Sequence, residues 1–147
     1  MKIRRAEKKD CQRMMELVLE LATFERAPQE VTVSQQHFED SGFGENPVWW
    51  AFVAEDNEKI VALALYYIRY STWKGQRMYL EDIIVTEAYR GQGIGKILFE
   101  RLVQEAKEKN FSGMMWQALE WNAPAFDFYK KFGARFDHEW VNCSIDF

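Results

Sequence analysis

The sequence is poor in cysteine and in long apolar runs, and each shortage excludes a class of protein. Its two cysteines, Cys11 and Cys143, stand at opposite ends of the chain without C-x-x-C spacing, which argues against a disulfide framework or a zinc site. No run of about 18 apolar residues is present to span a bilayer, and the charged start lacks the apolar core of a secretory signal. We therefore expect a cytoplasmic protein with reduced thiols, no metal ion and no membrane partner.

An excess of positive charge is also missing. The chain carries 19 Lys and Arg against 23 Asp and Glu, a formal net charge of -4. This balance gives no general attraction to nucleic-acid phosphates and suits a cationic ligand better. With 147 residues, 48% of them apolar, the chain has the size of one domain, which we expect to span residues 1–147.

Apolar periodicity predicts a mixture of strands and helices. Apolar residues recur at i, i+3, i+4 and i+7 after Asp10, which indicates one face of a helix that ends before Pro28. Residues 61–65 are apolar throughout, so their strand should be covered on both faces. The other predicted helices are residues 32–40, 93–109 and 123–132, and the predicted strands are residues 2–6, 49–55, 60–70, 77–85, 114–119 and 140–147. This order predicts an α/β fold, an α+β mixed sheet flanked by helices.

A glycine-rich segment follows the strand predicted at residues 77–85 and opens the next helix. It consists of Arg90, Gly91, Gln92, Gly93, Ile94 and Gly95, followed by Lys96. Glycines let backbone N–H groups approach a ligand, and a helix N-terminus offers free donors and partial positive charge to an anion. A pyrophosphate fits this segment, with Arg90 and Lys96 adding positive charge. Glycine turns also occur at helix starts for structural reasons alone, so the segment by itself leaves both interpretations open.

Two motifs resemble the signatures of the GNAT acetyltransferase superfamily. The segment from Arg90 to Gly95 is similar to R/Q-x-x-G-x-G/A, and residues 121–134 resemble N-x-x-A-x-x-F-Y-x-x-x-G. The resemblance implies the acyl-CoA N-acyltransferase fold and acetyl-CoA bound between the fourth and fifth strands, with Asn122 and Tyr129 near its sulfur. The implied cofactor-binding residues are Ile83, Ile84, Val85, Arg90, Gly91, Gln92, Gly93, Ile94, Gly95, Lys96, Asn122, Ala125, Tyr129 and Lys131.

Further segments resemble the diamine acetyltransferase family, which includes the spermidine/spermine and the thialysine N-ε-acetyltransferases. They are residues 21–25, 42–47, 70–75, 79–82 and 120–122. The resemblance implies a small primary amine as substrate and a homodimer as assembly. The implied substrate-binding residues are Phe24, Glu25, Ser71, Thr72, Trp73, Glu81 and Asp82.

The resemblance also orders the substrate hypotheses. At the position of Ser71, the polyamine acetyltransferases look to have an aspartate. The pair Ser71 and Thr72 instead resembles the thialysine branch of the family. Phe24 departs from the tyrosine of many relatives. The preferred hypothesis is that the substrate is a thialysine-like amino acid acetylated on its side-chain amine. Diamines or polyamines as substrates are the alternative. A protein N-terminal or lysine acetyltransferase and a non-catalytic acyl-CoA-binding module are further hypotheses.

Amine acetylation requires proton transfers at both reacting ends. An alkyl ammonium with a pKa of about 10.4 must lose a proton before it attacks a thioester. Strand alternation predicts Glu81 and Asp82 on opposite faces. The resemblance assigns Glu81 to the substrate amine, where it is the candidate for relaying the proton through water, and Tyr129 is the candidate acid for the departing thiolate. From the residues alone, the carboxylates could instead be surface ion-pair partners, and Tyr129 a core aromatic.

Overall fold

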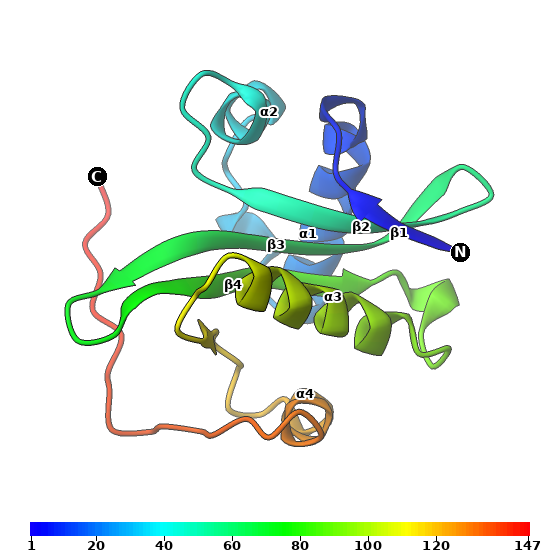
Figure 1. Ribbon diagram of the computed structural model, residues 1–147. Helices are drawn as coiled ribbons and strands as arrows, with labels where there is room; N and C mark the ends of the chain where they lie inside the picture. Colours follow the sequence, from blue (N-terminus) through cyan, green and yellow to red (C-terminus); the bar gives the residue numbers. More distant parts are fainter. The chain divides into compact units, whose positions relative to one another are not determined.

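A five-stranded mixed sheet, in the order β1-β2-β3-β4-β5, organises the first part of the chain (Figure 1). The computed structural model describes residues 1–147 and divides them into two compact units, residues 1–117 and 118–147. The first four strands pair antiparallel, and the fifth is parallel to the fourth. The strands are β1 (Lys2–Arg5), β2 (Trp50–Asp56), β3 (Lys59–Ser71), β4 (Gly75–Val85) and β5 (Met114–Met115).

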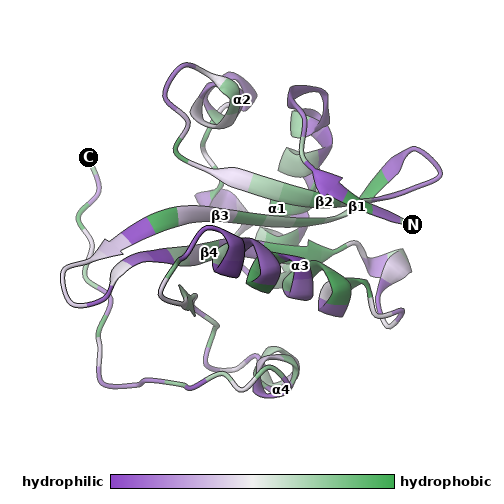
Figure 2. Cartoon of the chain, in the orientation of Figure 1, coloured by the Kyte–Doolittle hydropathy of each residue, from purple (hydrophilic) through white to green (hydrophobic).

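Helices pack on both faces of this sheet. On one face, Met14 and Leu17 of α1 (Cys11–Phe24) form a buried cluster with Val53 of β2 and with α2 (Gln35–Phe43). On the other face, the ring of Phe52 lies 4.3 Å from the guanidinium of Arg101, on α3 (Ile94–Glu108). Successive side chains of β2 therefore point to opposite faces of the sheet and contribute to the hydrophobic core on each face. Figure 2 shows hydrophobic residues along the central strands and both hydrophobic and hydrophilic residues along α3.

The inner position predicted for residues 60–70 is confirmed. β3 lies between β2 and β4, and its residues from Ile60 to Tyr66 are buried. The helix predicted at residues 32–40 begins and ends three residues later, at Gln35 and Phe43. Ser34 caps its start by accepting a hydrogen bond from the His37 N–H at 3.1 Å. It continues through Gly42 because the absent side chain leaves room for the Trp49 indole, which a Cβ would meet.

Two strand predictions near the C-terminus are wrong. The strand predicted at residues 114–119 is only the two-residue β5, paired with Met78 and Tyr79 of β4. Residues 140–147 form no strand, and the side chains of Trp140 and Val141 are 76% and 83% exposed. A run of apolar and aromatic residues is a local signal, whereas a strand also needs a neighbouring edge with which to pair. In residues 118–147 the regular element is α4 (Ala123–Lys130).

Candidate active site

A β-bulge in β4 brings two carboxylates together. β3 and β4 pair Leu65 with Asp82 and Tyr66 with Leu80, so Glu81 has no residue opposite it. Both Glu81 and Asp82 line one cavity on the α1 face of the sheet. The prediction that they point to opposite faces is therefore wrong, because the extra residue of a bulge interrupts alternation.

The cavity beside the bulge has a volume of about 390 Å³ and mostly apolar walls. Its rigid side is Trp49, whose ring stacks on Phe38 at 4.5 Å and whose indole N–H donates to the Phe38 carbonyl at 3.2 Å. The other apolar and aromatic lining residues are Met15, Val18, Val33, Val48, Leu65 and Tyr67. An apolar cavity with two carboxylates in one part of its wall fits a ligand that has an alkyl stem and a cationic amine.

Burial and mutual repulsion perturb three carboxyl groups. Burial, followed by the charges of Glu81 and Glu25, raises the pKa of Asp82 to about 7. Burial raises the pKa of Glu81, and burial with the Glu81 charge raises the pKa of Glu25 at the end of α1. None of the three forms an ion pair within the chain. Their negative charge is thus uncompensated, unlike that of surface ion-pair partners, and a bound cation would neutralise it.

The glycine-rich segment connects β4 with α3 and leaves open space beside it. Gly91 and Gly93 have left-handed φ angles of 76° and 82°, and a Cβ at either position would meet no atom within 4 Å. Gly93 is the N-cap of α3 and has no side chain to accept hydrogen bonds from the first turn. The N–H groups of Ile94, Gly95 and Lys96 therefore remain available to an anion, whereas the next one, of Ile97, donates to the Gly93 carbonyl at 3.2 Å.

The side chains of this segment differ in their surroundings. Ile94 is 3% exposed and anchors the helix start in the core. Gln92 and Lys96 are exposed, and the Lys96 ammonium lies 3.7 Å from Glu100 one turn along α3. Of the predicted cationic groups, Lys96 is therefore weakly engaged and free to reach an anion.

The Arg90 guanidinium, by contrast, contacts the chain itself. Its Nε donates to the Val85 carbonyl at 2.9 Å. Its Nη2 lies 3.5 Å from Oε1 of Glu20, and the group stands 5.8 Å from the centre of the Phe24 ring. The structure thus brings Phe24, predicted at the substrate, next to Arg90, predicted at the phosphate.

Glu20 is a residue of this region that the sequence did not identify. Its carboxylate accepts hydrogen bonds from Thr86 Oγ1 at 2.9 Å and from the N–H of Glu87 at 3.0 Å. Glu87 begins the short helix η3 (Glu87–Tyr89) that leads to Arg90. No sequence signal marks Glu20, because it is one of two acidic residues on an amphipathic helix, with Glu16 one turn before it.

β4 has an unpaired edge beyond the two-residue ladder with β5. Ile83, Ile84 and Val85 pair with β3 along one edge only, and β5 ends opposite Tyr79. This is where the resemblance implies that backbone groups bind the cofactor. The backbone of Ile83 and Ile84 faces no partner strand there, whereas the Val85 carbonyl already accepts from Arg90.

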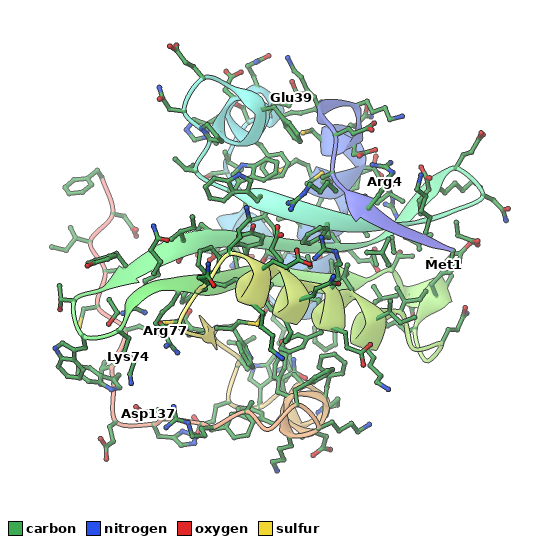
Figure 3. The ribbon with its side chains drawn as sticks, viewed as in Figure 1. Met1, Arg4, Glu39, Lys74, Arg77 and Asp137 are labelled. Atoms are coloured by element: carbon green, nitrogen blue, oxygen red, sulfur yellow. The ribbon has the colours of Figure 1, made fainter.

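The remaining predicted substrate residues lie at the tip of the β3–β4 hairpin, next to the labelled Lys74 (Figure 3). Ser71 Oγ accepts hydrogen bonds from the N–H groups of Trp73 and Lys74 at 3.2 and 3.1 Å, Thr72 is exposed, and Trp73 is 83% exposed. Ser71 pairs with Gly75, at the opposite end of β4 from Glu81, which is a separation of about 20 Å along the strand. Within one chain, the tip and the three carboxyls are not brought together.

The second motif builds α4 in the unit of residues 118–147. The Asn122 side chain caps this helix by accepting from the Ala125 N–H at 3.3 Å. Tyr129 is the buried residue of α4, 7% exposed, and packs edge-on against Phe128 with 5.4 Å between ring centres. Lys131 is exposed at the C-cap.

Neither a metal cluster nor a membrane span is present. No group of three or more His, Cys, Asp and Glu side chains is arranged to hold a metal ion. No helix has the length and apolarity needed to cross a bilayer. Both cysteines are free thiols, Cys11 in the core and Cys143 on the surface.

Comparison with known proteins extends the motif match to most of the chain. The model of the acetyltransferase (GNAT) family matches residues 4–134. The thialysine N-epsilon-acetyltransferase of Bos taurus is 39% identical over 141 residues, which cover 90% of this chain and 83% of that protein. The spermidine/spermine N(1)-acetyltransferase-like protein 1 of Homo sapiens is 34% identical over 139 residues, 90% of this chain and 20% of that protein.

Solved structures agree on the fold. An aminoglycoside acetyltransferase from an uncultured soil metagenomic sample, in complex with sisomicin, superimposes with a TM-score of 0.80 at 22% identity, over 99% of this chain and 95% of that chain. The mixed sheet, the glycine segment between β4 and α3 and the family match describe the same architecture. The chain belongs to the acetyltransferase (GNAT) family.

Proposed function

We propose that this protein transfers the acetyl group of acetyl-CoA to the side-chain amine of a small, thialysine-like amino acid. The observation that carries this proposal is the apolar cavity lined by both Glu81 and Asp82, with Glu25 close enough to raise the pKa of Asp82. A partly buried cluster of carboxyls without a cationic partner favours a ligand that brings its own ammonium group. The relative from Bos taurus, named for thialysine, supports the choice of substrate.

Residues 1–147 act in this proposal as one acetyltransferase domain. The family match runs from residue 4 to residue 134 and so includes parts of both compact units. The cosubstrate would lie against the glycine segment and the free edge of β4, and the resemblance to the family adds Asn122, Ala125, Tyr129 and Lys131 as cofactor-binding residues. The open space at Gly91 and Gly93 and the free first turn of α3 fit a pyrophosphate.

Each proton transfer has a candidate group in this chain. Bound acetyl-CoA supplies the thioester. Glu81 holds the substrate ammonium and takes its proton through water, so that the free amine can form the new C–N bond. Asp82, with its pKa of about 7, is the neighbour that can retain this proton near neutral pH. Tyr129 donates its proton to the sulfur as the C–S bond breaks, and a Tyr129→Phe variant with wild-type kcat would remove that assignment.

A diamine or polyamine acetyltransferase is the second candidate. Three carboxyls that interact electrostatically can bind a polycation as well as a single ammonium group. The human relative is named for spermidine and spermine. A protein N-terminal or lysine acetyltransferase ranks lower, because the cavity of about 390 Å³ matches a small ligand. A non-catalytic acyl-CoA-binding module ranks last, since binding of acyl-CoA alone does not require carboxyl groups with raised pKa values.

A single assay separates these functions. Thiol release from acetyl-CoA would be followed with thialysine, lysine, putrescine, spermidine and a lysine-containing peptide as acceptors. We expect the highest kcat/KM with thialysine. A tenfold preference for spermidine would assign the protein to the polyamine branch, faster peptide turnover would favour a protein acetyltransferase, and absence of turnover with measurable coenzyme binding would favour the binding module.

The proposal includes a homodimer that works in the cytoplasm, where acetyl-CoA is available. The exposed apolar side chains of Trp140, Val141 and Ile145 support an assembly in which a second copy covers them. Light scattering measures this state directly. A fully active monomer at micromolar concentration would contradict it.

A further inference from the structure

We infer that Glu20 is a positioning residue for the cofactor loop, because its carboxylate joins α1 to Thr86, Glu87 and Arg90 of the turn that leads from β4 into the glycine segment. This inference rests on the proposed function, since it assumes that coenzyme A binds at that segment. It adds a residue outside both family motifs, on a helix that otherwise contributes to the substrate side of the protein.

The contacts of Glu20 are arranged along the turn. Oε2 accepts from Thr86 Oγ1 at 2.9 Å, immediately after β4 ends. Oε1 accepts from the N–H of Glu87 at 3.0 Å, at the start of η3, and lies 3.5 Å from Nη2 of Arg90. The side chain is 29% exposed, so these contacts are partly protected from water.

Arg90 connects Glu20 to the glycines and limits the conformations of the residue that precedes them. Its Nε bonds the Val85 carbonyl at 2.9 Å, which closes the turn between residue 85 and residue 90. Gly91 and Gly93 follow at once and have no side chains to hold them, so their backbone would otherwise sample many conformations. Fixing the residue before them limits the directions in which the free N–H groups can point, and a preorganised site loses less entropy when it binds its ligand.

The charge of Glu20 makes this role separable from a simple electrostatic one. A carboxylate beside a pyrophosphate site repels the ligand, so an unimportant neighbour would give tighter coenzyme binding once its charge is removed. A positioning residue gives the opposite result, because the loop loses its anchor. The sign of the change in affinity therefore decides between the two roles.

The experiment compares two substitutions at Glu20. We expect Glu20→Ala to weaken coenzyme A binding by about tenfold, as for the loss of hydrogen bonds to a charged group, measured by calorimetry on the full chain. The KM for acetyl-CoA should rise in parallel, with kcat at saturating acetyl-CoA and the KM for the amine little changed. Glu20→Gln keeps an oxygen that accepts from the Glu87 N–H, and its NH2 group can donate to the Thr86 hydroxyl oxygen. This variant should therefore bind coenzyme A within about twofold of the wild type.

Glu16→Ala is the matched control. Glu16 lies one turn earlier on α1 and pairs with Arg13 at 3.0 Å, so its removal changes the charge without touching the turn. If Glu20→Ala is not folded, Thr86→Val removes the bond from the loop side and should weaken binding about threefold. Unchanged or tighter binding by folded Glu20→Ala, or a Glu20→Gln as weak as Glu20→Ala, would overturn the inference. A wild-type protein that binds no coenzyme A would instead overturn the proposed function.

Discussion

The two ends of β4 place their polar residues in different surroundings, although the sequence predicts substrate-binding groups at both ends. At the Gly75 end, Ser71 and Trp73 occupy an exposed turn in which the hydroxyl serves backbone N–H groups. At the Val85 end, Glu81 and Asp82 line an apolar cavity. The cause is coverage by α1 and α2: β3 is buried from Ile60 to Tyr66 and exposed from Ile68 to Tyr70. Burial, and not residue type alone, gives these carboxyls their chemistry.

The largest expected difference between the two ends is in coenzyme binding. Gly93→Asp should abolish measurable binding of coenzyme A, because the added carboxylate would stand in the open space beside the helix N-terminus and repel the pyrophosphate. Gly75→Asp is the matched control, since Gly75 also has a left-handed φ, 84°, and open space around it. Calorimetry should find the control near wild type. Equal binding by a folded Gly93→Asp protein would refute the cofactor assignment.

The carboxyls at the bulge should dominate catalysis. Glu81→Gln and Asp82→Asn should each lower kcat/KM for the amine by about 10²-fold or more, because each removes a group that holds or accepts the proton of the substrate ammonium. Gln76→Ala changes an exposed polar residue at the other end of β4 and should leave kcat/KM unchanged. Steady-state kinetics at saturating acetyl-CoA provides the measurement. Near-wild-type turnover by both bulge variants would move the acid–base chemistry elsewhere.

The pH dependence sharpens the same contrast. Because the pKa of Asp82 is about 7 in the folded protein, kcat/KM should rise as pH increases through about 7, and Asp82→Asn should lose that inflection. The sign for stability is opposite. The folded state retains a proton that the unfolded state releases near pH 4, so stability falls between about pH 4 and 7 and stays low above it.

This stability effect gives a second measurement on the same variant. Asp82→Asn should raise the Tm relative to wild type at pH 8, where the buried charge is removed, and should have little effect at pH 4. An equal Tm shift at both pH values would mean that Asp82 titrates as an ordinary exposed carboxyl.

The smallest expected effect is at the hairpin tip. Ser71→Asp should change the ratio of kcat/KM for spermidine over thialysine by no more than about twofold if each chain acts alone, because a charge about 20 Å from the carboxyls is screened at physiological salt. Competition between the two substrates in one reaction measures the ratio. A tenfold shift toward spermidine would instead indicate that the tip reaches a cavity in a second copy.

Local signals in the sequence predicted the helices and the glycine segment well. The spacing of Met14 and Leu17 gave α1 its buried face, and the segment after β4 became the N-terminus of α3. The same kind of signal failed at residues 140–147, where a run of apolar and aromatic residues finds no neighbouring strand. A helix satisfies its own backbone, whereas a strand depends on a distant partner.

The sequence by itself determined the family, the order of the elements up to α4 and the motifs for the cofactor, because these depend on residue type and short spacing. Only the tertiary structure decided that Glu81 and Asp82 share a cavity, since the bulge arises from the register between β3 and β4. It also decided that Ser71 lies away from them and that Glu20 contacts the cofactor turn. Each of these depends on a contact between segments far apart in the chain, and no spacing within one segment encodes it.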